Sequence, residues 1–269
     1  MSEANSARPS AERIVIRNCH EMEEYEACLE LQRQVWGFAD EDLVPTRLFI
    51  VAHKIGGQVI GAFDGDRLVA FALGIPGNRN GHLYMHSHML AVDAAFRNAG
   101  LGRRVKLFQR EDAIARGVEL IEWTFDPLEI KNAYLNVEKL GAIARRYTIN
   151  QYGLVSSSLQ GGLPTDRLTA EWWLKSKRVE AVLKDGRHPM IAGEVAIEVP
   201  AEIYGWKASP VHRHHAIEVQ QRNRAQFLEA FDKGLVVLAY ERDAHGSGKY
   251  VLGRWDEAWS YGRPAEVRQ

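Results

Sequence analysis

The sequence has little cysteine and no long run of apolar residues, and each shortage excludes a class of protein. Only Cys19 and Cys28 occur in 269 residues, so neither a disulfide framework nor a cysteine-based zinc site is expected. The apolar runs, such as 68–75 and 235–240, are far shorter than the roughly 20 residues that cross a bilayer. The first 12 residues are polar and lack the apolar stretch of a signal peptide. We therefore expect a reducing, cytoplasmic setting and no membrane partner.

An excess of charge of one sign is also lacking. Thirty-four Lys and Arg stand against 35 Asp and Glu, which gives a formal net charge of −1. This balance argues against a protein dedicated to nucleic acid or to an anionic membrane surface. Hydrophobic residues make up 46% and charged residues 26%, close to globular averages, so a folded protein with a sizeable core is expected.

The order of the expected helices and strands predicts a mixed α/β fold. Alternating apolar residues predict a strand at 13–19, and apolar residues at helical spacing predict helices at 20–36 and 45–54. Asp64-Gly65-Asp66 predicts a hairpin turn between strands at 58–63 and 67–75, with a loop at 76–81. Strands are further expected at 83–92, 120–125, 143–150, 167–174, 195–199, 235–241 and 250–255, and helices at 101–116, 130–140, 176–183 and 214–232. An antiparallel meander followed by strand–helix–strand crossovers is a layered α/β design.

The stretch 82–104, HLYMHSHMLAVDAAFRNAGLGRR, carries the most chemical information. Gly100 and Gly102 lack a Cβ where the backbone must approach a ligand closely. The helix that starts there presents unpaired amides and a positive dipole end, and Arg103 and Arg104 add cationic side chains. Together these features suit a pyrophosphate. The Rossmann pattern Gly-x-Gly-x-x-Gly is absent, and an ordinary tight turn is the alternative for the glycine pair alone.

These residues resemble the signature of the GNAT superfamily of acyl-CoA-dependent N-acyltransferases, which is Arg/Gln-x-x-Gly-x-Gly/Ala after a strand ending in a Leu-x-Val-like segment. Arg97, Gly100 and Gly102 match the turn, and Leu90-Ala91-Val92-Asp93 matches the strand end. The later segment from Asn132 to Glu138-Lys139-Leu140-Gly141 resembles the family's helix ending in EKLGF.

The resemblance covers about residues 13–150 and implies a mixed, mostly antiparallel central sheet flanked by helices. We divide the chain into a flexible N-terminus (1–12), a GNAT acyltransferase core (13–156) and an α+β C-terminal extension (157–269). The extension has too many residues for one closing strand, and it either continues the sheet or caps the acceptor site.

The resemblance also implies acetyl-CoA, or another acyl-CoA, as co-substrate and no metal. The backbone near Leu90 would polarise the thioester carbonyl. The cofactor-binding residues that it implies are Leu90, Ala91, Val92, Arg97, Asn98, Ala99, Gly100, Leu101, Gly102, Arg103 and Arg104. Asn132 either contacts the cofactor or only lies in the first turn of its helix. The cluster His212-Arg213-His214-His215 suggests a metal by composition, but it lacks a partnering cysteine or carboxylate motif, and we interpret it as a solvated helix start.

An amine acceptor has a pKa near ~10, so a base must take a proton from it. His86 and His88 lie two apart on one expected strand, share a face, and resemble a histidine pair that one branch of the family uses as a proton relay. Ordinary hydrogen-bonded histidines are the alternative. Glu122 is the second candidate base, unless it lies on a solvated strand face.

The family usually has a tyrosine that acts as the general acid, protonating the leaving thiolate, at the position where this chain has Val137. Tyr134, one turn earlier, is the substitute candidate unless it only packs, and Tyr147 is a weaker one.

The expected activity is transfer of an acetyl group, or of a larger acyl group such as succinyl, to the amine of a small molecule. An amino acid is one candidate acceptor. Neither cysteine has the setting of an acyl carrier, so we expect direct attack in a ternary complex. The alternative is a non-catalytic CoA-binding regulatory or scaffold module, which the valine at position 137 favours. The sequence is compatible with either a monomer or a homodimer.

Overall fold

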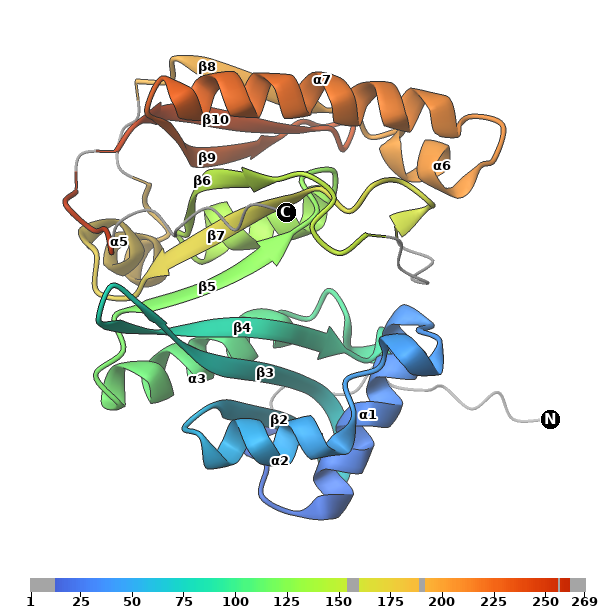
Figure 1. The fold of residues 1–269 in the computed structure, drawn as a ribbon, viewed down its shortest axis with the longest axis vertical. Coiled ribbons are helices and arrows are strands. Elements are labelled where there is room, and N and C mark those ends of the chain that lie inside the picture. Colours follow the sequence, from blue (N-terminus) through green and yellow to red (C-terminus); the bar gives the residue numbers. More distant parts are fainter. Residues whose placement is uncertain (1–12, 154–159, 189–191, 256, 262–269) are drawn as a thin grey trace. The chain divides into compact units, whose positions relative to one another are not determined.

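The computed structural model describes residues 13–153, 160–188, 192–255 and 257–261. The chain forms two compact units, each described by itself below (Figure 1). The first unit contains the residues up to Pro76 and Ser87–Ala115, and the second contains Gly77–His86 and the residues from Arg116 onward. The predicted N-terminal segment 1–12 and the predicted boundary at residue 156 lie outside the described residues, and our three-part division stays a prediction.

The first unit is a small sheet covered by helices on both faces. Its strands are β1 (Val15–Asn18), β2 (Gln58–Asp64) and parts of β3 (Arg67–Arg79) and β4 (His82–Val92), in this order across the sheet. β1 and β3 both pair antiparallel with β2. The helices are α1 (Met22–Trp36), α2 (Thr46–Lys54) and α3 (Leu101–Ala115), with short 3-10 helices at Asp40–Asp42 and Ala94–Phe96.

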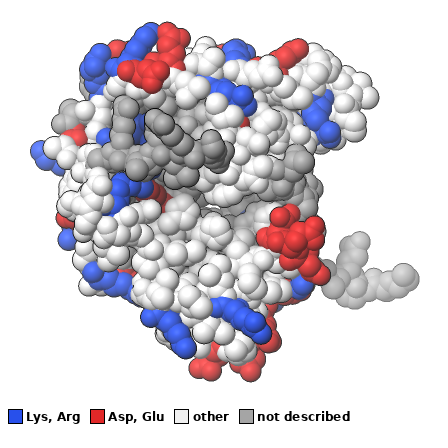
Figure 2. All heavy atoms as spheres, viewed as in Figure 1, with Lys and Arg blue, Asp and Glu red and all other residues white. Residues whose placement is uncertain are grey.

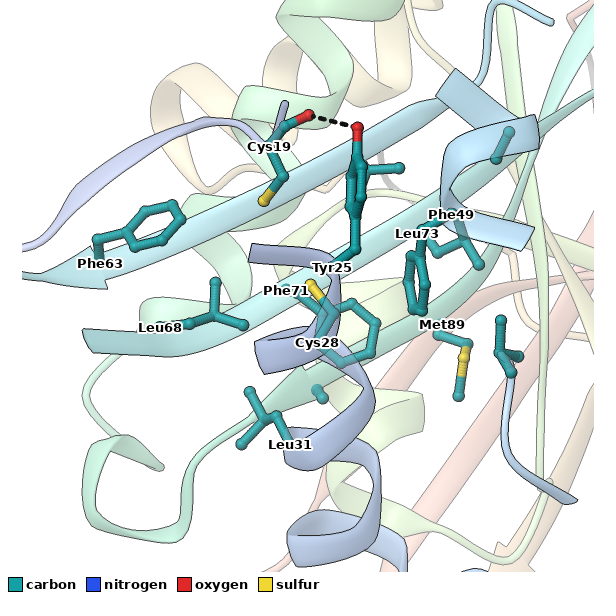
Figure 3. Close-up of a cluster of buried hydrophobic side chains, with 14 residues drawn as sticks. Cys19, Tyr25, Cys28, Leu31, Phe49, Phe63, Leu68, Phe71, Leu73 and Met89 are labelled. Atoms are coloured by element: carbon teal, nitrogen blue, oxygen red, sulfur yellow. Dashed lines mark hydrogen bonds between the residues drawn. The ribbon is translucent and has the colours of Figure 1, made fainter. Parts of the chain in front are cut away.

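Two hydrophobic clusters lie on opposite faces of this sheet, because successive side chains of a strand alternate between faces. One cluster joins α1 and α2 to the sheet and contains both cysteines (Figure 3). There the Tyr25 hydroxyl donates to the Cys19 carbonyl at 3.2 Å, and neither cysteine forms a disulfide. The other cluster joins Leu101 and Val105 of α3 to the opposite face. Packing on both faces holds the end of β4 and the start of α3 in place.

The hairpin after residue 75 differs from the prediction. β3 continues through Pro76 to Arg79, so the predicted loop at 76–81 shrinks to the turn at Asn80 and Gly81, whose φ angles are 52° and 84°. Two left-handed residues form the tight turn that matches the twist of paired strands. Pro76 and Gly77 suggested a loop, but Gly77 instead gives space to a side chain, since a Cβ there would lie 2.6 Å from the Tyr84 ring.

The second unit is a larger, mostly antiparallel sheet. Its strand order is β4-β5-β7-β6-β9-β10-β8, with β4 represented by His82–His86. β5 (Leu120–Phe125) runs parallel to β4, and the later pairs are antiparallel. The other strands are β6 (Ile143–Thr148), β7 (Arg167–Trp173), β8 (Val195–Val199), β9 (Leu235–Arg242) and β10 (Gly248–Arg254). The strands after residue 157 thus enter the same sheet as β5 and β6.

Helices cover this sheet as well. α4 (Ile130–Ala133) continues directly into a π-helical turn at Tyr134–Lys139, and α5 (Lys177–Asp185) starts at the Ser176 cap. α7 (Arg213–Asp232) runs alongside β8 and β10 (Figure 1), where the Phe227 ring contacts Tyr147 and Tyr250. The short helix α6 (Ile203–Ala208) was not predicted, because Gly205 interrupts its pattern.

The predicted mixed α/β, mostly antiparallel fold is confirmed. In the part of the chain that the structure describes, no helix is both long and apolar enough to cross a membrane.

Candidate active site

In the first unit, β4 leads the chain into the predicted glycine turn. Asp93 accepts a hydrogen bond from the Ala95 amide at 2.8 Å and pairs with Arg67 at 2.5 Å, which fixes the strand end. Arg97 Nε donates back to the Val92 carbonyl at 3.1 Å. The turn 97–100 is exposed, so a ligand has access to its backbone.

The backbone of this turn is left-handed at two positions. Asn98 and Gly100 have φ angles of 63° and 77°, and α3 starts immediately afterwards at Leu101. A left-handed φ angle is strained for most residues but not for glycine, so the backbone conformation at position 100 favours glycine. At Gly102 a Cβ would lie 3.7 and 3.8 Å from side-chain atoms of Val92 and Leu90, which is ordinary contact. The glycine requirement of the fold is therefore stronger at position 100 than at position 102.

The start of α3 presents the expected amides. The Arg104 amide donates to the Gly100 carbonyl at 3.1 Å, and the amides before it have no carbonyl of their own helix four residues back. Such amides and the positive end of the helix dipole favour a phosphate group. The Arg104 side chain also connects α3 to the residue before β1, because its Nη2 donates to the Ile14 carbonyl at 2.9 Å.

The strand residues named for the cofactor are fixed by packing. Leu90 and Val92 are half-buried against the α3 cluster, and Ala91 is buried in the α1/α2 cluster. This alternation anchors the strand on both faces of the sheet beside the turn. An extended arm can pair with such a backbone, and the turn has open, left-handed geometry, so the residues present fit a CoA pyrophosphate and its pantetheine arm.

The two predicted histidines belong to different units. His86 is half-buried in the second unit and lies in register with Glu122 of β5, and paired residues of neighbouring strands project to the same face. His88 belongs to the first unit and keeps an exposed face, but partial loss of water lowers its pKa below the usual 6.5. A lowered pKa leaves the His88 imidazole neutral at neutral pH, which is the form that accepts a proton.

Glu122 is almost fully buried, so the solvated strand face that was its alternative is not found. Its side chain is 3% exposed, and its two oxygens accept from Arg79 Nη1 and Nη2 at 2.6 and 2.7 Å. Arg146 Nη2 also donates to the same carboxylate. Because guanidinium groups engage both oxygens of Glu122, a structural role is the better hypothesis for this residue.

The predicted acid Tyr134 lies in the π-helical turn of the second unit. Its ring is half-buried, with Lys139 Nζ and Arg242 Cζ at 5.0 and 5.4 Å from the ring centre. Val137, at the position where the family usually has a tyrosine, is buried in the core, and Asn132 is exposed. The roles of Tyr134 and Asn132 stay predictions.

Tyr147 is the poorer acid. Its hydroxyl donates to Asp166 at 2.7 Å, and burial together with that carboxylate raises the pKa of Tyr147 well above its usual value. A phenol held in this way keeps its proton.

Sequence reasoning missed four charged residues that form one ion-pair cluster with Glu122. They are Arg79, Arg145, Arg146 and Glu171. Burial by itself would raise the pKa of Glu171, but the charges of Arg146 and Arg145 outweigh it and hold that pKa below its usual value. A glutamate in an otherwise apolar strand and two consecutive arginines in another were the available signals. Neither signal shows that the strands are neighbours.

Among the described residues, no group of three or more His, Cys, Asp or Glu side chains is placed to hold a metal ion. His214 and His215 contact each other at the start of α7, with ring centres 3.9 Å apart.

A mixed α/β fold with an exposed left-handed turn at the start of a helix is what we expect of a protein that binds a diphosphate-bearing ligand. Residues 20–135 match the model of the acetyltransferase (GNAT) family, a range that includes the whole turn. This part of the chain is a domain of that family, and the predicted resemblance is confirmed. Acyl transfer is therefore its reaction class, with acyl-CoA as co-substrate. A search of the curated proteins finds no match to the chain.

Several solved structures are similar to this chain at low identity. The ribosomal-protein-S18-alanine N-acetyltransferase of Escherichia coli is 15% identical and has a TM-score of 0.49, over 61% of this chain and 95% of that one. yncA of Salmonella typhimurium, solved with acetyl-CoA, is 15% identical with a TM-score of 0.49, over 63% and 99%. An aminoglycoside 6'-acetyltransferase type Ii is 18% identical with a TM-score of 0.47, over 61% and 99%.

Proposed function

We propose that the chain transfers an acyl group, acetyl by default, from acyl-CoA to the amine of a small molecule by direct attack in a ternary complex. The observation that carries the proposal is the exposed turn 97–100, left-handed at Gly100 and opening directly into α3, inside the segment that matches the acetyltransferase family. The face shown in Figure 2 has Lys and Arg interspersed with Asp and Glu rather than one field of a single sign, which suits a small acceptor better than a polyanion.

The residues of the first unit would hold the co-substrate. Backbone amides from Asn98 to Gly102 bind the diphosphate, and the side chains of Arg97 and Arg103 add positive charge. The backbone of Leu90 and Val92 pairs with the pantetheine arm as an added strand would. The bound thioester supplies an activated acyl carbon, and a backbone amide near Leu90 polarises its carbonyl.

The histidines supply the base in this proposal. The acceptor amine loses a proton to His86 or His88, its new C–N bond replaces the C–S bond, and coenzyme A leaves as the thiol. The proton for the thiolate comes from Tyr134 or from water. Either histidine accepts a proton only in its neutral form, which the lowered pKa of His88 favours.

A pair of glycine variants tests the binding step. Gly100 and Gly65 both have left-handed φ angles, 77° and 61°, and in both an added Cβ would have no atom within 4 Å. Gly100→Ala and Gly65→Ala should therefore lose similar stability, about 1 kcal/mol each. Calorimetry should show a loss of CoA affinity for Gly100→Ala alone. Equal CoA affinity in both variants would overturn this role for the turn.

A turnover assay distinguishes an acyltransferase from the alternative, a CoA-binding module without catalytic activity. Thiol release from acetyl-CoA should accelerate with at least one member of a panel of small amines, amino acids and peptide N-termini. A chain that binds CoA but accelerates release with no amine is a binding module. Acceleration by peptides alone would move the acceptor class from small molecules to proteins.

A further inference from the structure

In the second unit, a β-bulge turns two consecutive arginines to one face of the sheet. β6 pairs with β7 at Ala144↔Ala170 and next at Tyr147↔Leu168, so two residues of β6 oppose one residue of β7. In a regular strand Arg145 and Arg146 would point to opposite faces. Here both reach the Glu171 carboxylate, Arg145 Nη2 at 2.7 Å and Arg146 Nε at 3.1 Å. Bulges of this kind often re-aim side chains beside active sites.

The arginines outnumber the carboxylates that they contact. Glu122 and Glu171 are register partners on β5 and β7, and each side chain is 3% exposed. Three guanidinium groups, those of Arg79, Arg145 and Arg146, bind these two carboxylates. The cluster therefore carries one positive charge more than it neutralises, and its arginines are only 12–27% exposed. A surplus charge in such a setting is screened less by water than one on the surface.

Arg145 and Arg146 each also keep one terminal nitrogen, Nη1, outside these ion pairs. Arg145 uses Nε and Nη2 on Glu171 and donates from Nη2 to the Trp259 carbonyl at 3.0 Å, whereas Arg146 uses Nε and Nη2 on the two glutamates. Within the residues that the structure describes, neither Nη1 has a hydrogen-bond partner, and neither is among the buried unpartnered atoms. Two neighbouring guanidinium groups with accessible N–H donors suit a carboxylate, which accepts paired hydrogen bonds.

The residues on the same face continue this polar surface. His86 is in register with Glu122, and Thr124 pairs with Thr169 two residues further along β5 and β7. Arg167, two residues before Thr169, lies over the Tyr152 ring at 5.5 Å. Hydroxyl, imidazole and guanidinium groups thus lie on the same face of the sheet as Glu122 and Glu171.

We propose that Arg145 and Arg146 bind a carboxylate that one of the two substrates carries. This inference rests on the proposed acyl transfer and narrows its substrate class to an acid. The carboxylate has two sources: the amine acceptor, which would then be an amino acid, or the acyl group, which would then be the half-thioester of a dicarboxylic acid. Glu122 and Glu171 hold the arginines in place and are positioning residues.

The experiment measures binding without turnover in two arms. The first arm compares the affinities of amino acids with those of the corresponding decarboxylated amines, in the presence of CoA. The second arm compares succinyl-CoA with acetyl-CoA. The acid should bind about tenfold to a hundredfold better than its uncharged counterpart in one arm, the range of a charge-assisted hydrogen bond. An equal affinity in both arms overturns the proposal.

A series of variants that change the net charge of the same cluster distinguishes a role of the arginines in carboxylate binding from a purely structural role. Arg145→Gln removes the surplus charge, Glu171→Gln raises it to two, and the double variant restores it to one. The preference for the acid should fall in Arg145→Gln, rise in Glu171→Gln and return in part in the double variant. Arg254→Gln is the control, because Arg254 pairs with Glu194 and is 71% exposed. A preference that is the same in all four variants contradicts the proposal even where stability changes.

Two further measurements distinguish a failure of this inference from misfolding of a variant and from a failure of the proposed function. If Arg145→Gln does not fold, Arg145→Lys keeps the charge but loses the planar pair of donors, and it should retain only part of the preference. CoA affinity of the unaltered protein reports on the proposed function by itself. CoA binding with no acid preference defeats this inference alone, whereas absence of CoA binding defeats the proposed function.

Discussion

The glycine turn of the first unit and the arginine–glutamate cluster of the second unit are built in different ways. The turn uses backbone amides and left-handed φ angles within a stretch of six residues, Arg97 to Gly102. The cluster uses side chains from β3, β5, β6 and β7, between Arg79 and Glu171 in the sequence. One is local and carries little buried charge, and the other is assembled from distant strands around two buried carboxylates.

The comparison predicts where each unit is sensitive to substitution. A backbone site depends on the conformation of one or two residues, so small changes there affect ligand binding with a modest effect on folding. A buried charge cluster couples binding to stability, because removing one partner leaves the other charges buried without compensation. Three predictions, from the largest expected effect to the smallest, sharpen this contrast.

The largest effect should follow the loss of Glu122. In Glu122→Ala the Arg79 and Arg146 guanidinium groups lose a buried carboxylate that both contact, so the free energy of unfolding should fall by about 3–5 kcal/mol. Urea denaturation measures the loss. Glu229→Ala is the control, since its pair with Lys233 is exposed to water and its loss should change the free energy of unfolding far less. Equal losses in the two variants would show that the cluster is not a buried ion network.

The next effect should be on catalysis. His88→Gln or His86→Gln should lower kcat about 100-fold if that histidine is the base. The base must be neutral, and the pKa of His88 lies below 6.5, so the acidic limb of the kcat profile should lie below pH 6.5. That limb should vanish in His88→Gln if His88 is responsible. A rate unchanged in both variants at all pH values removes the pair from the mechanism.

The smallest effect should come from Gly102→Ala. A Cβ fits there at ordinary contact distances, and alanine favours a helix over glycine, so unfolding should require about 0.5–1 kcal/mol more. CoA affinity should stay within a few-fold of the original, in contrast to Gly100→Ala. Calorimetry with CoA checks both. A loss of affinity at position 102 with a gain in stability would show that the ligand, not the fold, requires this glycine.

The sequence was sufficient to predict most helices and strands and the turn of the first unit. Those features depend on residues close together in the chain, such as Asn98 and Gly100 before a helix start. The extent of β3 was not predictable in this way, because Pro76 and Gly77 are typical of a loop and only the Tyr84 ring explains the glycine. The roles proposed for His86, His88, Tyr134 and the turn residues still await the experiments above.

What the sequence by itself determined was the family, the fold class and the presence of the glycine turn, since hydrophobic periodicity and a short glycine motif are local properties of the chain. Only the tertiary structure decided that Glu122 lies among guanidinium groups and that Arg145 and Arg146 share a face. The reason is physical: strand order places β7 between β5 and β6, and a one-residue bulge reverses the direction of a side chain. Neither strand order nor bulge position follows from the residue pattern of the individual strands.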